Sequence, residues 1–292
     1  MNIKTLIASS PKINVLGTPV NRTSYQESTK LIIHSARLSK TFTVAAVNVH
    51  SLVTGYLQPK KHGYYLSRST FVVPDGQPVR WALNLLRQPG EMFLTEPVRG
   101  PELMLRVCEK AAEEGISIFL YGSTESVLAD LQCNLQRKYP NLVIAGAVSP
   151  PFRALTPAED SAYIQQIRQS GADIVFVGLG CPSQEKWMTE HGNELSCPIL
   201  SVGAAFDIHA GKVKEAPLWV QSLCLEWMFR LIQEPTRLWK RYLIYNPLYL
   251  IFLLLQLLNL LPSPTSVKPK AYQESVKLQA QHLEVGKVES VS

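Results

Sequence analysis

Paired cysteines, a long apolar run and a dense charge of one sign are all missing from this sequence of 292 residues. Its five cysteines are widely spaced and include no CxxC pair, which argues against a disulfide scaffold and favours a reducing compartment. Lys and Arg number 29 against 23 Asp and Glu, and a net charge of +6 is too diffuse to argue for nucleic acid. Hydrophobic residues make up 46%, so a mostly disordered chain is excluded.

Several functional signatures are also missing. The N-terminal apolar run Leu6–Ala8 is too short for a signal peptide, and Pro11 interrupts it. There is no GxGxxG, no Walker A motif, no Asp-x-Asp pair and no Cys/His cluster with metal-ligand spacing. We therefore expect a chain whose bulk stays in the cytoplasm and which uses neither a cofactor nor a metal.

Short apolar runs alternate with helical patterns over most of the chain. This alternation predicts βαβ units in an α/β fold, with a Rossmann-like, mainly parallel sheet flanked by helices on both faces. A Thr156–Glu159 capping box opens one of the helices. The predicted strands are Thr43–Val49, Thr70–Val73, Ile116–Tyr121, Leu142–Val148, Asp173–Val177 and Ile199–Val202, and the predicted helices between them are Pro78–Arg87, Pro101–Glu114, Thr124–Tyr139, Pro157–Gln169 and Pro182–Leu195.

The pattern changes after Lys214 and suggests three regions. Residues 1–216 form the predicted α/β catalytic core. Residues 217–261 are predicted to be a helical appendage, with helices at Trp219–Gln233, from Pro235 onward and at Leu248–Leu261. Residues 262–292 are polar and poor in aromatics, so we expect a mostly disordered tail.

The apolar segment of the appendage favours a membrane surface. Only 14 residues separate Pro247 from Pro262, roughly 21 Å of helix, whereas a bilayer core needs about 20 residues. A helix that dips into the interface fits better than a spanning one, and a buried helix or an oligomer contact is the alternative. Cationic residues just before it suit anionic headgroups: Arg230, Arg237, Lys240 and Arg241.

Ligands bind an open α/β sheet at the carboxyl ends of its strands, so the residues that follow each strand are candidates. Asp75 follows the strand Thr70–Val73 on a glycine-containing turn. It could act as a general base toward a substrate hydroxyl, or it could merely cap the next helix.

Three further strand ends carry candidate residues. A weak signal for a phosphate-binding site at a helix start comes from Gly122, Ser123 and Thr124, and a plain capped turn is the alternative. Gly178 and Gly180 permit close approach to the backbone, while Gln184 could bind a sugar or base edge. Glu185 could be a second acid or base, or could complement a helix N-terminus. Asp207 and His209 lack a nucleophile to complete a triad.

Arg237 and Arg241 are four residues apart and therefore share a helix face, which suits a diphosphate or a lipid headgroup. Glu226 and Arg230 have the same spacing and are predicted to form a helix-stabilising pair.

Taken in order, these motifs resemble the WecG/TagA/CpsF glycosyltransferase family. The resemblance extends from about Ile13 to Leu243. It rests on the runs AAVNVHSLV, VVPDGQPVRWA, VRGPELM, IFLYGS, ADIVFVGLGCPSQEKW, SVGAAFDIHAGKVKEAP and LEWMFRLIQEPTRLWKRYL.

The resemblance implies an inverting, metal-independent transfer of a sugar from a UDP-sugar to an undecaprenyl-diphosphate-linked acceptor in polysaccharide biosynthesis. The enzyme would associate peripherally with the inner face of the cell membrane through its C-terminal helices. Asp75 falls at the family's proposed base, and substrate contacts fall on Gln184, Arg230, Arg237 and Arg241. We also expect such contacts from Asn48 in the first motif and Arg99 in the third.

Two positions depart from the family pattern and bear on donor or acceptor identity. Ala46 replaces a frequent Thr, and Pro97 stands at a frequent Arg. They motivate one alternative, a non-catalytic membrane-associated scaffold with a vestigial site. A nicotinamide-dependent oxidoreductase is disfavoured by the absent GxGxxG. The sequence leaves open which sugar is transferred and which polymer is made. It also leaves open the oligomeric state, and a homo-oligomer is one option.

Overall fold

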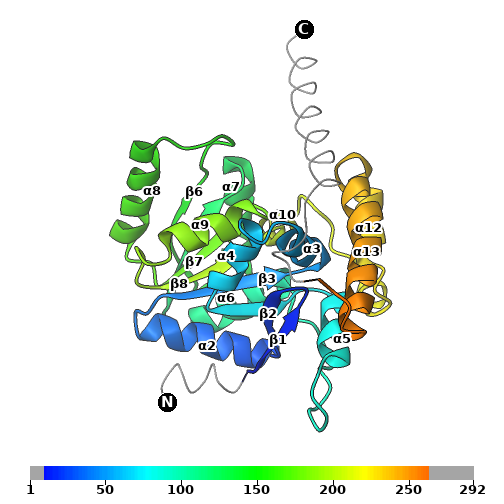
Figure 1. Cartoon of the computed structure of the whole chain (residues 1–292). Coiled ribbons are helices and arrows are strands. Elements are labelled where there is room, and N and C mark those ends of the chain that lie inside the picture. The colour runs from blue at the N-terminus through cyan, green and yellow to red at the C-terminus, as the bar shows by residue number, and fades with distance from the viewer. Residues whose placement is uncertain (1–9, 263–292) are drawn as a thin grey trace.

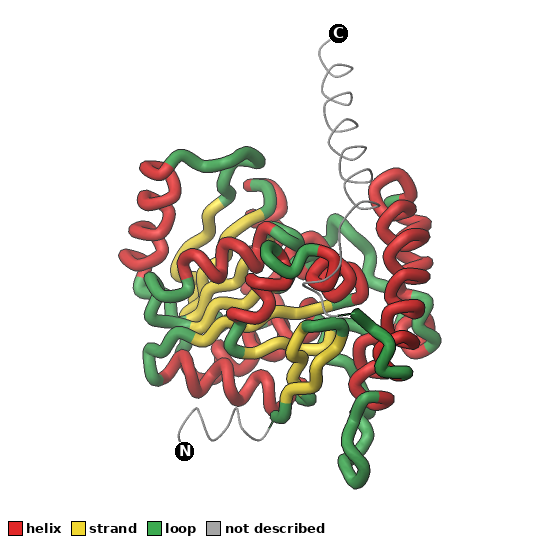
Figure 2. Tube along the Cα trace, in the orientation of Figure 1, coloured by secondary structure: helices red, strands yellow, loops and turns green. Residues whose placement is uncertain are grey.

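A six-stranded parallel sheet forms the centre of the computed structural model, which describes residues 10–262. The strand order is β4-β3-β8-β7-β5-β6. Figure 2 shows these strands as one central block with helices around it. The strands are β3 (Phe42–Val47), β4 (Phe71–Pro74), β5 (Ser117–Gly122), β6 (Val143–Val148), β7 (Ile174–Gly178) and β8 (Pro198–Ser201).

The sheet has a separate hydrophobic core on each face, because successive side chains of a strand point to opposite sides. In β7, Ile174 and Phe176 contribute to one core, and Val175 and Val177 contribute to the other. The first core is closed by α2 (Tyr25–Arg37), α6 (Gly100–Glu114), α7 (Glu125–Lys138) and α10 (Ala205–His209). The second is closed by α3 (Val49–Leu57), α4 (His62–Arg68), α5 (Gln77–Leu85), α8 (Pro157–Ser170) and α9 (Ser183–His191).

The predicted α/β architecture is confirmed, with all six expected strands in place within one or two residues. The Thr156–Glu159 capping box also forms. The antiparallel hairpin of β1 (Lys12–Val15) and β2 (Thr18–Asn21) was not predicted, nor were the helices α2, α3, α4 and α10.

The topological switch point of the sheet lies between β3 and its neighbour β8. The chain leaves β3 into α3 on one face of the sheet, whereas it leaves β8 into α10 on the other face. Chain segments that diverge in this way leave an opening at the carboxyl edge, where open α/β sheets bind their ligands.

The C-terminal helices form a layer beside this edge of the sheet (Figure 1). They are α11 (Leu218–Ser222), α12 (Glu226–Gln233) and α13 (Pro235–Leu257). The prediction of one helix over Trp219–Gln233 was wrong, because α11 and α12 are separate. The expected separate helix from Leu248 is instead part of α13, which continues through Pro247. The predicted tail lies outside the described residues except for Pro262.

Helix α13 packs against the core with one side only. Tyr249 and Leu253 are buried in the core that contains α3, and Tyr249 Oη donates to Pro78 O at 2.9 Å. The solvent-facing part of α13 leaves an apolar stripe exposed, which we call the α13 outer face. Its residues, spaced seven, four and three positions apart, are Leu243, Leu250, Leu254 and Leu257. Within residues 10–262, no helix has the length and hydropathy required to cross a bilayer.

Two glycines allow β5 and β7 to end side by side. Gly122 has a φ of +123°, and a Cβ built on it would lie 2.7 Å from the backbone carbonyl carbon of Gly178. A Cβ on Gly178 would lie 2.6 Å from the buried ring of Phe206. Both positions thus require glycine for packing.

We predict that Gly122→Ala lowers the free energy of unfolding by about 2–3 kcal/mol, because it adds backbone strain and a clash with main-chain atoms. Gly90→Ala is the matched control, since Gly90 also has a positive φ, +88°, but has open space around it. Its expected cost is about 1 kcal/mol. Chemical denaturation measures both, and equal losses would show that crowding at Gly122 is unimportant.

Candidate functional site

Asp75 lies at the carboxyl end of β4, beside the end of β3. Its backbone N–H donates to Val47 O at 2.9 Å, which fixes the turn next to the neighbouring strand. The following helix α5 has Gly76 as its N-cap and no side-chain cap bond. The alternative of Asp75 as a helix cap is therefore wrong, and its partly exposed carboxylate is free of that structural task.

Asn48 joins this carboxylate to the C-terminal helices. Its Oδ1 caps α3 by accepting from Ser51 N at 3.2 Å and also accepts from the Arg241 guanidinium at 3.3 Å. Because the amide oxygen faces these two donors, the amide nitrogen points the other way, and Asn48 Nδ2 donates to Asp75 Oδ2 at 3.4 Å. The structure therefore brings together three residues that lie far apart in sequence, as expected for one site.

Arg99 connects the core to the appendage. Its side chain is 10% exposed, and its guanidinium lies 2.8 Å from Glu215 Oε1, 2.6 Å from Gln221 Oε1 and 2.8 Å from Glu226 Oε1. Burial raises the pKa of Glu226, and the charge of Arg99 partly offsets this. Arg99 thus anchors the segment that leads into α12, and a contact with substrate stays a prediction.

The expected pair of Glu226 with Arg230 is replaced by other partners. Glu226 bonds Arg99, whereas Arg230 lies 3.8 Å from Glu234. Glu234 also pairs closely with Arg237. The bond between Glu226 and Arg99 ties α12 to the core. The pairs with Glu234 hold Arg230 and Arg237 near the start of α13.

Arg230 and Arg237 also lie near the loops that follow β5 and β8. Burial raises the pKa of Asp207 in α10, and the nearby charges of Arg237 and Arg230 counteract this shift. A hydrogen bond from Ser123 lowers the same pKa. The predicted residues Ser123, Asp207, Arg230 and Arg237 therefore form a second group along the carboxyl edge.

The Gly122–Thr124 turn matches the capped-turn alternative. Thr124 Oγ1 accepts from Val127 N at 3.3 Å and caps α7. Ser123 adopts a left-handed backbone with φ +60°. Of the predicted glycines, Gly180 alone has open space around it, so a ligand can approach its backbone, whereas Gly122 and Gly178 are packed.

Gln184 and Glu185 are almost fully buried, at 3% and 0% exposure. Gln184 Oε1 accepts from Gly203 N at 3.1 Å, and its Nε2 donates to Glu185 Oε1 at 2.9 Å. Gln184 thereby ties the start of α9 to the loop after β8. Burial raises the pKa of the Glu185 carboxyl to about 7. Direct contact of either residue with substrate stays a prediction.

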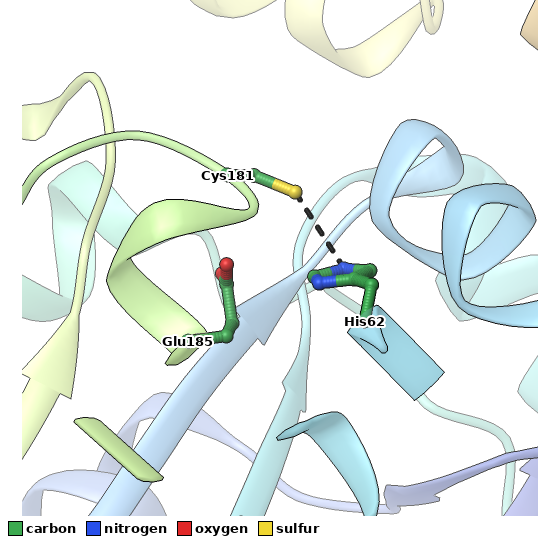
Figure 3. A group of neighbouring side chains, drawn as sticks. All are labelled: His62, Cys181 and Glu185. Carbon is green, nitrogen blue, oxygen red and sulfur yellow. Dashed lines mark hydrogen bonds between the residues drawn. The ribbon is translucent and has the colours of Figure 1, made fainter. Parts of the chain in front are cut away.

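Three side chains that could hold a metal meet next to this region: His62, Cys181 and Glu185 (Figure 3). Spacing in the sequence does not point to this group, because 119 positions separate His62 from Cys181. Ser51, whose Oγ lies 2.9 Å from His62 Nε2, was not predicted either. Only the fold reveals this group.

Comparisons of the sequence with a family model and with known proteins both indicate a glycosyltransferase. The sequence model of the Glycosyl transferase WecG/TagA/CpsF family matches residues 13–262. The chain is 28% identical to the N-acetylglucosaminyldiphosphoundecaprenol N-acetyl-beta-D-mannosaminyltransferase of Staphylococcus aureus strain MW2, over 80% of this chain and 88% of the relative. The proteins of the same name from strains NCTC 8325 / PS 47 and MRSA252 match with the same identity and coverage. The chain belongs to the WecG/TagA/CpsF family of glycosyltransferases.

Proposed function

We propose that this chain is an inverting, metal-independent glycosyltransferase that moves a sugar from a UDP-sugar to a saccharide on a polyprenyl diphosphate. The observation that carries the proposal is the Asp75 carboxylate at the carboxyl edge of the sheet. It caps no helix, and the Asn48 amide lies 3.4 Å from it. A carboxylate held in this way suits a general base.

In the proposed reaction, Asp75 takes the proton of the acceptor hydroxyl. The hydroxyl oxygen forms a bond to the anomeric carbon of the donor, and the bond from that carbon to the phosphate oxygen of UDP breaks. Attack opposite the leaving group inverts the configuration. Asn48 orients the carboxylate for proton transfer, since its amide is fixed by Ser51 and Arg241.

The leaving UDP gains negative charge, which donors aimed at the phosphates stabilise. Arg230, Arg237 and Arg241 supply fixed positive charge, and guanidinium groups match phosphate geometry. Gly180 lets a phosphate approach the backbone after β7 because no atom occupies the space near it. These groups support transfer in which protein cations, rather than a metal ion, neutralise the diphosphate.

The relatives suggest both substrates. Their name specifies an N-acetylmannosaminyl transfer to N-acetylglucosaminyldiphosphoundecaprenol, so UDP-N-acetylmannosamine is the first donor to assay here. A polyprenyl acceptor keeps its tail in a bilayer. The α13 outer face and the nearby arginines favour peripheral binding at the inner face of the cell membrane.

The alternative of a non-catalytic scaffold was motivated by Ala46 and Pro97, and the structure gives it little support. Ala46 packs against the core of the sheet, and Pro97 is buried. Neither change removes the Asp75 carboxylate or its contact with Asn48.

We expect Asp75→Asn to reduce transfer roughly 100-fold or more while UDP-sugar binding persists, because the amide cannot accept the hydroxyl proton. The assay measures acceptor-dependent UDP release with EDTA present, using a soluble lipid-diphospho-sugar analogue. Asp130→Asn is the control, since Asp130 is a half-exposed carboxylate in α7 that pairs with Lys212. Near-normal turnover by Asp75→Asn would remove Asp75 from the mechanism.

Arg237→Met should raise KM for the UDP-sugar roughly 10-fold, because one cation near the diphosphate is lost. Arg168→Met is a close match, since each arginine is more than half exposed and pairs with a glutamate. Steady-state kinetics with saturating acceptor compare the two. An equal, small effect in both variants would place Arg237 outside the donor site.

The double variant Leu250→Asp/Leu254→Asp should weaken binding to anionic vesicles at least about 10-fold, since both side chains are more than half exposed on the α13 outer face. Leu38→Asp/Val143→Asp changes two exposed apolar residues elsewhere and should bind normally. Co-sedimentation with vesicles measures both. Unchanged binding by the first variant would contradict a membrane contact through α13.

A further inference from the structure

His62, Cys181 and Glu185 form a compact donor cluster that the proposed transfer does not use. His62 is the first residue of α4, Cys181 lies in the loop after β7, and Glu185 lies in α9. One ligand atom of each lies within 4.8 Å of the others. In Figure 3 the Cys181 thiol points toward the imidazole of His62, and the Glu185 carboxylate lies beside them. Three distant segments thus present a thiol, an imidazole and a carboxylate to one point.

The spacing of the cluster is that of metal ligands. In a tetrahedral zinc site with usual bond lengths, a sulfur and a nitrogen ligand lie about 3.6 Å apart. Cys181 Sγ and His62 Nε2 are 3.6 Å apart. The carboxylate lies within 4.8 Å of both of these atoms, so it needs a shift of at most about 1.3 Å to reach a similar separation.

Two polar atoms of the cluster are buried without a hydrogen-bond partner in the described part of the chain. They are Glu185 Oε2 and His62 Nδ1, in residues only 0% and 1% exposed. Buried polar atoms are rarely left without a partner. The carboxylate oxygen, whose polar neighbour is the Cys181 thiol, is therefore available to a cation.

The chemistry of the three donors selects the ion. A thiolate and an imidazole favour zinc over magnesium or calcium, which prefer oxygen ligands throughout. A thiolate and a carboxylate together carry two negative charges, which balance a divalent cation. The Ser51 hydroxyl, 2.9 Å from His62 Nε2, lies where it can provide a fourth ligand or hold a water that does so.

We propose that His62, Cys181 and Glu185 bind a Zn²⁺ ion that clamps α4 to α9 and the loop before it. The ion is stabilising and not catalytic, because Asp75 and Asn48 are not among its ligands. Removal of the ion therefore lowers the thermal unfolding midpoint by a few degrees while acceptor-dependent transfer persists.

Cobalt substitution tests the site directly. The untagged full chain, stripped with EDTA and dialysed, is titrated with Co²⁺, and thiolate-to-cobalt charge-transfer absorption reports the Cys181 ligand. We expect saturation at one ion per chain and displacement by Zn²⁺. Glu185→Gln and His62→Gln should each weaken Co²⁺ binding roughly 10-fold or more, since each removes a ligand.

Cys181→Ser should abolish the charge-transfer band, whereas Cys133→Ser should keep it, because Cys133 is an exposed cysteine outside the cluster. Far-UV circular dichroism checks that each variant folds, and His62→Gln replaces Cys181→Ser if the latter does not. No band in the wild-type chain at saturating Co²⁺, or a band that survives in Cys181→Ser, would overturn the proposal.

Discussion

The amide of Asn48 is the contact on which the arrangement of the site depends. It satisfies the N-terminus of α3 and the guanidinium of Arg241 through its oxygen, and it faces Asp75 through its nitrogen. One side chain therefore connects two neighbouring strand ends with the C-terminal appendage. Ser51 and Arg241 fix the orientation of the Asn48 amide. The amide N–H₂ group of Asn48 therefore faces the Asp75 carboxylate, which makes no helix-capping hydrogen bond of its own.

The anchoring of the appendage follows a similar logic. Arg99 is buried, and three side chains from the segment between residues 215 and 226 converge on its guanidinium. A buried guanidinium without these partners would be costly, so the appendage and the core stabilise each other. The arginines that we assign to the diphosphate follow directly after this anchored segment.

The sequence predicted the sheet well because its strands are short apolar runs followed by clear helix starts, and all but the edge strand β6 are mostly buried. It failed where patterns overlapped or were short. The strand expected to end at Val49 runs into α3 with hardly a break, and the Ser24–Glu27 capping box of α2 was an available signal that went unread. The cluster of His62 with Cys181 could not be found from spacing, since only the packing of α4 against α9 brings them together.

The last turns of α13 reach back to β1 and the turn that follows it. Gln256 donates to Asn14 O at 2.7 Å and accepts from Leu16 N at 2.9 Å, across about 240 positions. A chain synthesised from its N-terminus cannot make these bonds until α13 is complete. The same delay applies to Arg241 and Asn48. The α/β core can therefore form during synthesis, while the proposed site stays unfinished until α13 has left the ribosome.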